Sequence, residues 1–497
     1  MAKYILSIDQ GTTSSRAILY NKALQVIACQ QQELPLNYPK PGWVEQDPEQ
    51  IWQTVYHCII AVLHQAGINA SDVAGIGITN QRETTLLWHR ATGKVLYPAI
   101  VWQDRRSSKQ CQQLKDQGLD TLLQQKTGLL ADPYFSATKL AWLLQHVAGA
   151  KQQAENAELC FGTVDSYLLW QLTGGKVHAT DASNASRTLL FNIHSQCWDD
   201  ELLKLFDIPA TLLPEVKDNA GLFGLTDSKL FGAAIPVLSM IGDQQAALLG
   251  QACVSAGMSK STYGTGCFAV VNTGENIISS QHKLLTTVAW RLNGNCTYAL
   301  EGSIFMAGAT VQWLRDKLGV IQQASETEAL AEQSHYQQTE LLIPAFTGLG
   351  TPYWQPEIKA ALFGMTRDTG RAELAAAALC SVAYQSRDLL TAIAQDGITV
   401  DSLRVDGGMT ANRWYLQALS DLTQTEITRC HTTDATALGA AFLAALQLGY
   451  FSCLNNIEQI WQAGWQFQPQ LPAITADGLY RRWQRAVVAL TTLDLSV

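Results

Sequence analysis

Residues 4–20 read YILSIDQGTTSSRAILY, and this stretch decides the fold of the chain. The residues before Asp9 are mostly apolar and prone to form β-strands. The next six residues are small or polar, and apolar residues return between Arg16 and Tyr20. Two apolar segments of strand length around a short polar turn predict a β-hairpin.

The same arrangement returns in the second half of the chain. Ser259–Tyr263 predicts a strand, Gly264-Thr265-Gly266 a turn, and Cys267–Asn272 a returning strand. Two such hairpins indicate two similarly built halves, although no residue-level repeat is visible. We place the boundary near residue 250, which predicts domains at residues 1–250 and 251–497.

Other segments predict helices mixed with further strands. A helix begins at Asp47-Pro48, an N-cap followed by proline, and ends at Gly67. Residues 73–79, 237–241 and 403–406 predict buried strands, and further helices follow from Gln244 and over residues 412–422. Strands and helices that are mixed throughout the chain indicate an α/β protein.

Three turns contain residues suited to binding phosphate. The first follows Asp9, the second is Gly264-Thr265-Gly266, and the third is Asp406-Gly407-Gly408. Glycine lets backbone N–H groups point at an anion, and a carboxylate at a strand end can hold hydrated Mg²⁺. Each of these turns, taken alone, is also explained as an ordinary sharp hairpin turn that binds no phosphate. A Walker-type sequence is absent, so a nucleotide would have to bind between two domains.

Composition excludes several classes of protein. The formal net charge is −9 and the Lys and Arg residues are scattered, which disfavours nucleic acid and anionic membranes as partners. The eleven cysteines contain no C-x-x-C pair, so we expect free thiols in the cytoplasm. No apolar run approaches the roughly 18 residues of a membrane span, and the N-terminal apolar run is too short for a signal peptide.

Ten motifs together carry a resemblance to a known family. From about residue 3 to 450 the chain resembles the glycerol kinases, members of the FGGY group of carbohydrate kinases in the superfamily of actin, heat-shock ATPases and hexokinase. The motifs are DQGTTSSRA, PGWVEQDP, GITNQRETT, WQDRR, DPYFSATK, TDASNASRTLLFNI, GDQQAAL, YGTGCF, PAFTGLGTPYW and RVDGG.

The resemblance implies a fold, a reaction and a set of site residues. The fold would be α/β, with two ribonuclease-H-like (actin-like ATPase) domains and an active site in the cleft between them. The substrates would be ATP and glycerol, with Mg²⁺ as cofactor, in a cytoplasmic homodimer or homotetramer. The implied glycerol contacts are Arg82, Glu83, Trp102, Tyr134, Asp243, Gln244 and Phe268. The implied nucleotide contacts are Thr12, Thr13, Ser14, Arg16, Thr265, Gly308, Gln312, Gly408 and Asn412. Asp243 would be the general base, and Asp9 and Asp243 would bind the metal through water.

These residue types suit a molecule of three adjacent hydroxyls. Arg82 is a rigid donor, Glu83 is an acceptor, and Trp102 and Phe268 can cover the C–H side. Each residue also has an ordinary explanation. Arg82 would then be a surface ion-pair residue, the aromatic residues would belong to the core, and Asp243 would be only a helix N-cap.

Two other functions share these motifs. A pentulose kinase of the FGGY group shares the first turn and the DGG motif, but NQRETT, DPYF and GDQQ favour glycerol. An actin-like or heat-shock-type ATPase shares the phosphate-binding turns, but it has no need for a polar and aromatic substrate pocket. Residues 229–236 lack the arginine with which bacterial glycerol kinases bind a sugar bisphosphate, so inhibition of that kind is not expected.

Overall fold

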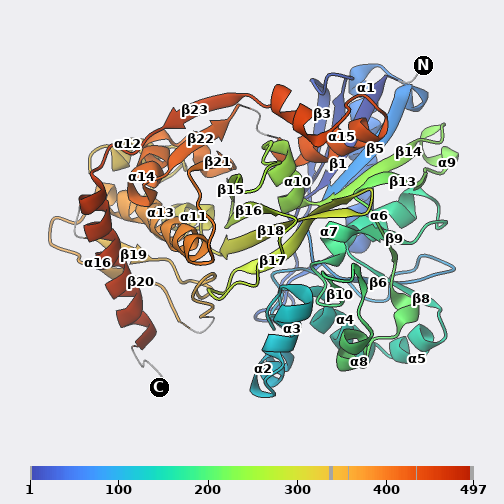
Figure 1. Cartoon of the computed structure of the whole chain (residues 1–497), viewed down its shortest axis with the longest axis horizontal. Coiled ribbons are helices and arrows are strands. Elements are labelled where there is room, and N and C mark those ends of the chain that lie inside the picture. The colour runs from blue at the N-terminus through green and yellow to red at the C-terminus, as the bar shows by residue number, and fades with distance from the viewer. Residues whose placement is uncertain (1–2, 335–339, 356–357, 432–433, 493–497) are drawn as a thin grey trace.

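A mixed sheet forms the framework of the first half. The computed structural model describes residues 3–334, 340–355, 358–431 and 434–492. The strand order of the sheet is β13-β14-β5-β1-β2-β3 (Figure 1). Strands β1, β2 and β3 form an antiparallel series, whereas β5 pairs with β1 in parallel and β14 pairs with β5 in parallel. The bounds are β1 Tyr4–Gln10, β2 Ser14–Tyr20, β3 Val26–Glu33, β5 Val73–Asn80, β13 Ala220–Leu225 and β14 Pro236–Gly242.

A second sheet repeats this arrangement. Its order is β17-β18-β16-β15-β21-β22-β23. Again three central strands form an antiparallel series, here β15, β16 and β18, and two later strands run parallel to the first of them. The predicted α/β fold with two similarly built halves is therefore confirmed. The bounds are β15 Ser259–Tyr263, β16 Cys267–Gly274, β17 Leu285–Leu292, β18 Asn295–Ile304, β21 Ser402–Asp406, β22 Glu426–Cys430 and β23 Ala463–Phe467.

Both predicted hairpins are present. In the first, Asp9 on β1 pairs with Arg16 on β2, and the Gly11 amide donates to the Ser14 carbonyl oxygen at 2.9 Å. In the second, Tyr263 pairs with Cys267. Side chains alternate between the two faces of a strand, so this register places Asp9 and Arg16 on the same face.

The predicted helices are present, and their bounds lie within one residue of those predicted. Helix α1 (Pro48–Ala66) is capped by Asp47, whose carboxylate accepts from the Glu49 amide at 2.9 Å, and it ends at Gly67 in the left-handed conformation. Helices α10 (Asp243–Gly250) and α14 (Arg413–Thr423) also match their predictions.

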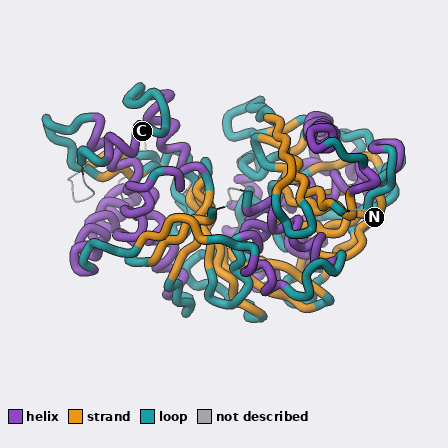
Figure 2. The backbone as a smooth tube through the Cα atoms, turned by 90° about the horizontal axis from the view of Figure 1, so that it is seen from above, coloured by secondary structure: helices purple, strands orange, loops and turns teal. Residues whose placement is uncertain are grey.

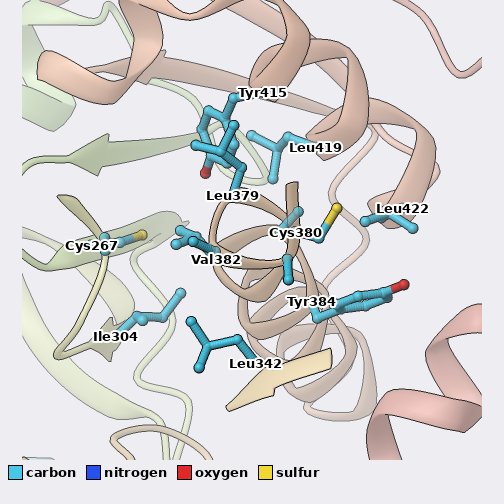
Figure 3. Packing of buried hydrophobic residues seen from close by; sticks show 14 of the residues in the cluster. Cys267, Ile304, Leu342, Leu379, Cys380, Val382, Tyr384, Tyr415, Leu419 and Leu422 are labelled. Carbon is cyan, nitrogen blue, oxygen red and sulfur yellow. The ribbon is translucent and has the colours of Figure 1, made fainter. Parts of the chain in front are cut away.

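A large apolar core lies in the second half. Its central helix is α13 (Arg371–Gln395), which packs between the sheet and helix α14. Figure 3 shows Leu379 and Val382 of α13 among residues of the strands and of α14. This helix is rich in alanine, and its residues 375–386 are all buried, so both of its faces contact the core.

Helix α15 (Ala435–Gln447) joins the two halves. Although it comes late in the chain, it packs against β1, β5 and β14, and Figure 1 shows this red helix among the blue strands. The Ser7 hydroxyl donates to the Ala437 carbonyl oxygen at 2.8 Å. Helix α15 also crosses α10 closely, since a Cβ atom on Gly439 would lie 2.0 Å from the Ala246 carbonyl oxygen. The division at residue 250 stays a prediction, because this helix packs on the first sheet.

The remaining elements surround these two sheets. Viewed from above, the N-terminal and C-terminal ends lie in opposite parts of the molecule (Figure 2). None of the helices in the described ranges is long and apolar enough to cross a membrane.

In the first half the other strands and α-helices are β4 Glu45–Gln46, β6 Leu86–His89, β7 Ala99–Ile100, α2 Ser108–Asp116, α3 Asp120–Thr127, α4 Ser136–His146, α5 Ala150–Glu155, β8 Leu159–Gly162, α6 Val164–Leu172, β9 Ala179–Asp181, α7 Ala182–Ala185, β10 Phe191–Asn192, β11 Cys197–Trp198, α8 Asp200–Phe206, β12 Glu215–Lys217 and α9 Ser228–Phe231. In the second half they are α11 Gly308–Asp316, α12 Glu326–Ala331, β19 Leu341–Ile343, β20 Ala361–Phe363 and α16 Ala473–Thr492.

Candidate active site

A cavity of about 490 Å³ lies in the second half, next to the second hairpin. Five of the predicted nucleotide contacts line it, namely Thr265, Gly308, Gln312, Gly408 and Asn412. They come from the hairpin, from helix α11 and from the turn after β21. Other lining residues that the sequence did not single out include Val311, Arg315, Thr327, Leu379 and Met409. The volume and the mixture of apolar and polar lining suit a small-molecule ligand such as a nucleotide.

The other predicted nucleotide contacts lie on the first hairpin. Thr12, Thr13 and Ser14 form its turn, and Arg16 follows on β2. Gln46 fixes the turn by donating to the Thr12 carbonyl oxygen at 2.6 Å. Arg16 forms an ion pair with Asp434, which comes from the second half of the chain. The turn that is predicted to bind phosphate, on one half, thus stands beside a charged residue of the other half.

Three aromatic rings form a wall beside this turn. The Trp102 ring lies 5.6 Å from that of Tyr134 and 5.9 Å from that of Phe268, both edge-on. The indole N–H of Trp102 donates to the Thr12 hydroxyl at 2.9 Å. Tyr134 belongs to the apolar cluster there and Phe268 borders it, as their ordinary explanation holds. Tyr134 also contacts two buried charged groups, those of Arg82 and Arg187. The predicted apolar wall therefore adjoins the phosphate-binding turn.

Arg82 is buried, so it is not a surface residue. Its side chain is 1% exposed, and its Nη1 and Nη2 atoms bind the two carboxylate oxygens of Glu301 at 2.5 and 3.0 Å. The Nε atom lies 3.1 Å from Asp243 Oδ1. Nη1 also donates to the Gln245 side chain at 3.2 Å, and Nη2 to the Tyr134 hydroxyl at 3.3 Å. A direct contact with substrate stays a prediction, because in this structure protein groups surround the whole guanidinium.

Glu83 lies next to Arg82 in an unusual backbone conformation. Its φ of 60° is left-handed, which is uncommon for a residue other than glycine and is found most often at functional sites. Its carboxylate accepts from Nε of Arg187 at 2.7 Å. Burial raises the pKa of Glu83, and the two arginines Arg82 and Arg187 oppose that shift. The fold therefore keeps this carboxylate buried, although a charged carboxylate is solvated better by water.

Asp243 is the first residue of helix α10. The N-cap of that helix is Gly242, so the explanation of Asp243 as only an N-cap is wrong. A Cβ atom on Gly242 would lie 2.8 Å from Cδ of Arg82, so glycine lets the arginine pass. The Asp243 side chain is 28% exposed, and its pKa is raised by burial, with Arg82 and Lys260 acting in the opposite direction. A partly exposed carboxylate with a raised pKa is well suited to accept a proton.

Asp9 lies close enough to Asp243 for their charges to interact. The pKa of Asp9 is raised to about 6, and burial is the main cause. The charge of Arg16 opposes this shift, whereas the charges of Asp243 and Asp434 contribute to it. No group of three or more metal-binding side chains occurs among the residues that the structure describes. Mg²⁺ commonly binds through one or two carboxylates, with water and phosphate as the other ligands. Asp9 and Asp243 fit that donor set.

Gln244 is bonded to a buried lysine of the second half. Its side-chain oxygen accepts from the Lys260 ammonium at 2.5 Å, and the residue is 8% exposed. Lys260 lies on β15 and also donates to Thr262 at 3.0 Å. Burial lowers the pKa of Lys260, while Asp406 and Asp243 raise it. A contact between Gln244 and glycerol stays a prediction.

Three charged residues of this site were missed in the sequence. Glu301 stands alone in the apolar strand YALEGSI, Arg187 lies in TDASNASRTLLF, and Lys260 lies in a predicted strand. A single charge inside an apolar segment is the signal that marks Glu301, because such a residue is seldom buried without a partner. Arg187 and Lys260 lie in polar segments, so no signal of this kind marks them. Nη1 of Arg187 is buried and has no hydrogen-bond partner among the described residues, next to the ring of Tyr134.

Comparisons with known proteins identify the family. The model of the FGGY family of carbohydrate kinases matches with its N-terminal domain over residues 4–250 and with its C-terminal domain over residues 260–448. A glycerol kinase of Marinomonas sp. is 56% identical and covers 99% of this chain and 100% of its own. Glycerol kinase 1 of Pseudomonas aeruginosa is 55% identical and covers 98% of this chain and 99% of its own.

Solved structures agree with this assignment. The Plasmodium falciparum glycerol kinase with ADP is 35% identical, with a TM-score of 0.92 over 99% of both chains. A xylulose kinase from Lactobacillus acidophilus has a TM-score of 0.89 at 22% identity over 99% of both chains, which shows the same fold. The family models and the relatives span nearly the whole chain, so this protein belongs to the FGGY family of carbohydrate kinases.

Proposed function

We propose that this protein is a glycerol kinase, which transfers the γ-phosphoryl group of ATP to a terminal hydroxyl of glycerol and forms sn-glycerol 3-phosphate. The observation that carries the proposal is a cluster of side chains. Buried charged groups and aromatic rings meet beside the first phosphate-binding turn, where Trp102 bonds Thr12 at 2.9 Å. Curated relatives with more than half of their residues identical are glycerol kinases, which supports the same substrate.

Glycerol would be held by donors and acceptors on one side and by rings on the other. Arg82 and Tyr134 would donate to its hydroxyls, and Glu83 would accept from them. Trp102 and Phe268 would cover the C–H face. A pocket that bonds each hydroxyl rejects analogues that lack one, because its own buried groups are then left unpaired.

In the transfer step, Asp243 would accept the proton of the terminal hydroxyl. The hydroxyl oxygen attacks the γ-phosphorus, and the bond between that phosphorus and the bridging oxygen of ADP breaks. Arg16 and the amides of the hairpin turns would balance the negative charge of the phosphates. Mg²⁺, when bound, would neutralise charge on ATP, and Asp9 and Asp243 would hold it through water.

The adenosine part of ATP would occupy the 490 Å³ cavity of the second half. Thr265 and Gly408 would then contact the phosphates, and Gln312 and Asn412 would line the remainder. The first hairpin, with Thr12, lies on the other half of the chain. This arrangement would place the γ-phosphoryl group between the two hairpins. We also propose that the enzyme works in the cytoplasm and that it forms a homodimer or homotetramer. Light scattering after gel filtration measures the mass of the assembly and so tests the oligomeric state.

Release of ADP measured across a panel of polyols and sugars tests the function. We expect release that depends on glycerol, and little release without an acceptor. Faster turnover of a pentulose would instead assign the chain to a pentulose kinase. Release that needs no acceptor would indicate an ATPase of the actin or heat-shock type. The pocket of Arg82, Glu83 and Tyr134 argues against that last function, because an ATPase that only changes shape has no acceptor to bind.

A further inference from the structure

We propose that Glu301, on strand β18 of the second half, is a positioning residue for the substrate pocket of the first half. It would act by orienting the guanidinium groups of Arg82 and Arg187. The inference rests on the proposed function, since it assumes that this pocket binds the phosphoryl acceptor. It adds a second charged residue from the opposite half, beside Lys260, to a site whose proposed polar substrate contacts come from the first.

The geometry of the carboxylate supports this role. Its Oε2 atom accepts from Arg82 Nη1 at 2.5 Å, and its Oε1 atom accepts from Arg82 Nη2 at 3.0 Å and from Arg187 Nη2 at 2.9 Å. Two parallel bonds between a guanidinium and a carboxylate fix the plane as well as the position of the arginine. Glu301 is 0% exposed, so water does not compete for these bonds.

The residues around Glu301 form a series of alternating charges. It runs from Glu83 through Arg187 to Glu301, then through Arg82 to Asp243. The two ends are the proposed hydroxyl acceptor and the proposed general base. Burial raises the pKa of Glu301, but Arg187 and Arg82 together outweigh it and hold that pKa at about 2, so the carboxylate is charged throughout the working pH range. Removing that charge would leave two buried arginines without their shared partner.

The position of Glu301 in the second sheet connects the pocket to the arrangement of the halves. In the β-ladders Glu301 pairs with Val270 on β16 and with Leu285 on β17, so a rigid sheet fixes its backbone. Phe268, one of the proposed pocket walls, pairs with Ser303 on the same strand. Paired residues, and residues two apart on one strand, point to the same face. Glu301 and Phe268 therefore reach the pocket together from the second half.

The test is steady-state kinetics of Glu301→Gln and Glu301→Asp, with the acceptor that the panel selects. Glutamine keeps the shape but removes the charge and turns an N–H toward an arginine. Aspartate keeps the charge but is one methylene shorter. Glu340→Gln is the matched control, because Glu340 is also a buried carboxylate of the second half and bonds to Thr369.

For Glu301→Gln we expect the KM of the acceptor to rise at least tenfold, with the KM of ATP within twofold of the parent. Glu301→Asp should recover part of the loss, and Glu340→Gln should leave both KM values unchanged. A second substitution at Arg82 should add less to Glu301→Gln than it costs alone, because both act on one group. If Glu301→Gln does not fold, the KM of the acceptor and the KM of ATP of the Glu301→Asp variant are compared with those of the parent instead.

Two results would overturn the proposal. One is an acceptor KM within twofold of the parent in a folded variant. The other is an equal rise of both KM values, which would indicate a role in stability alone. Failure of the proposed function has a different signature, since the parent would then release no ADP in response to glycerol. The acceptor chosen from the panel would still report on Glu301.

Discussion

Arg82→Lys keeps a positive charge in the pocket but removes the planar fork of the guanidinium. Arginine contacts Glu301 at 2.5 and 3.0 Å and Asp243 at 3.1 Å, and these partners lie in different directions from its three nitrogens. A lysine has one nitrogen and cannot reach all of them. We expect the ammonium to stay with Glu301, because that carboxylate is fully buried. The contacts to Asp243 and Tyr134 would then be lost.

The size of the effect follows from these contacts. A hydrogen bond to a charged group contributes about 1.5–3 kcal/mol. Losing one such contact in the glycerol complex raises the KM for glycerol roughly ten- to a hundredfold, since a factor of ten is about 1.4 kcal/mol. The KM for ATP should hardly change, because the nucleotide cavity is lined by other residues.

The assay compares kcat/KM for glycerol and for 1,2-propanediol, which lacks one terminal hydroxyl. The parent should discriminate strongly between them, and Arg82→Lys should discriminate less. Arg291→Lys is the matched control, because Arg291 is a partly buried arginine that pairs with Asp218 at 2.6 Å and is not among the proposed pocket residues. Equal discrimination by Arg82→Lys and by the parent would show that Arg82 is not a substrate ligand.

Four further predictions concern the base, the nucleotide cavity, a buried lysine and regulation. Asp243→Asn should lower kcat by about 10²–10⁴-fold, as expected for loss of a general base, with the melting temperature nearly unchanged; a kcat within threefold of the parent would contradict this role. Thr265→Val should raise the KM of ATP more than that of glycerol. A larger rise in the KM of glycerol would show that the second hairpin does not bind the nucleotide. Burial lowers the pKa of Lys139 from 10.5 to about 8, so its charge costs the folded state stability. Between pH 8 and 10.5 the Lys139 side chain is protonated only in the unfolded chain, so raising the pH stabilises the folded state. The free energy of unfolding in urea of the parent, minus that of Lys139→Met, should therefore rise by up to about 3 kcal/mol over this range. A constant difference would show that the lysine does not titrate there. Fructose 1,6-bisphosphate should not inhibit at micromolar concentration, because residues 229–236 contain no arginine to bind its phosphates.

Local patterns in the sequence predicted much of the fold. Both hairpins and helix α1 depend on neighbours in the chain: apolar segments around a polar turn, and a cap at Asp47 with a stop at Gly67. The similar construction of the two halves was also predictable, because the same hairpin pattern occurs twice in the sequence. The packing of helix α15 against the first sheet was not, because it joins residues that are far apart in sequence.

For the candidate site, the sequence by itself determined the chemistry that is present. The turn after Asp9, the glycines of the second hairpin and the motifs with Arg82, Tyr134 and Asp243 indicated a phosphoryl transfer to a small polyol. Only the tertiary structure decided which groups meet. Glu301 lies outside the quoted motifs, Arg187 lies inside one that indicated no role for it, and both are far from Arg82 in the chain. Ion pairs between distant elements depend on how the two sheets pack, and burial determines how strong those pairs become, so neither can be derived from local sequence alone.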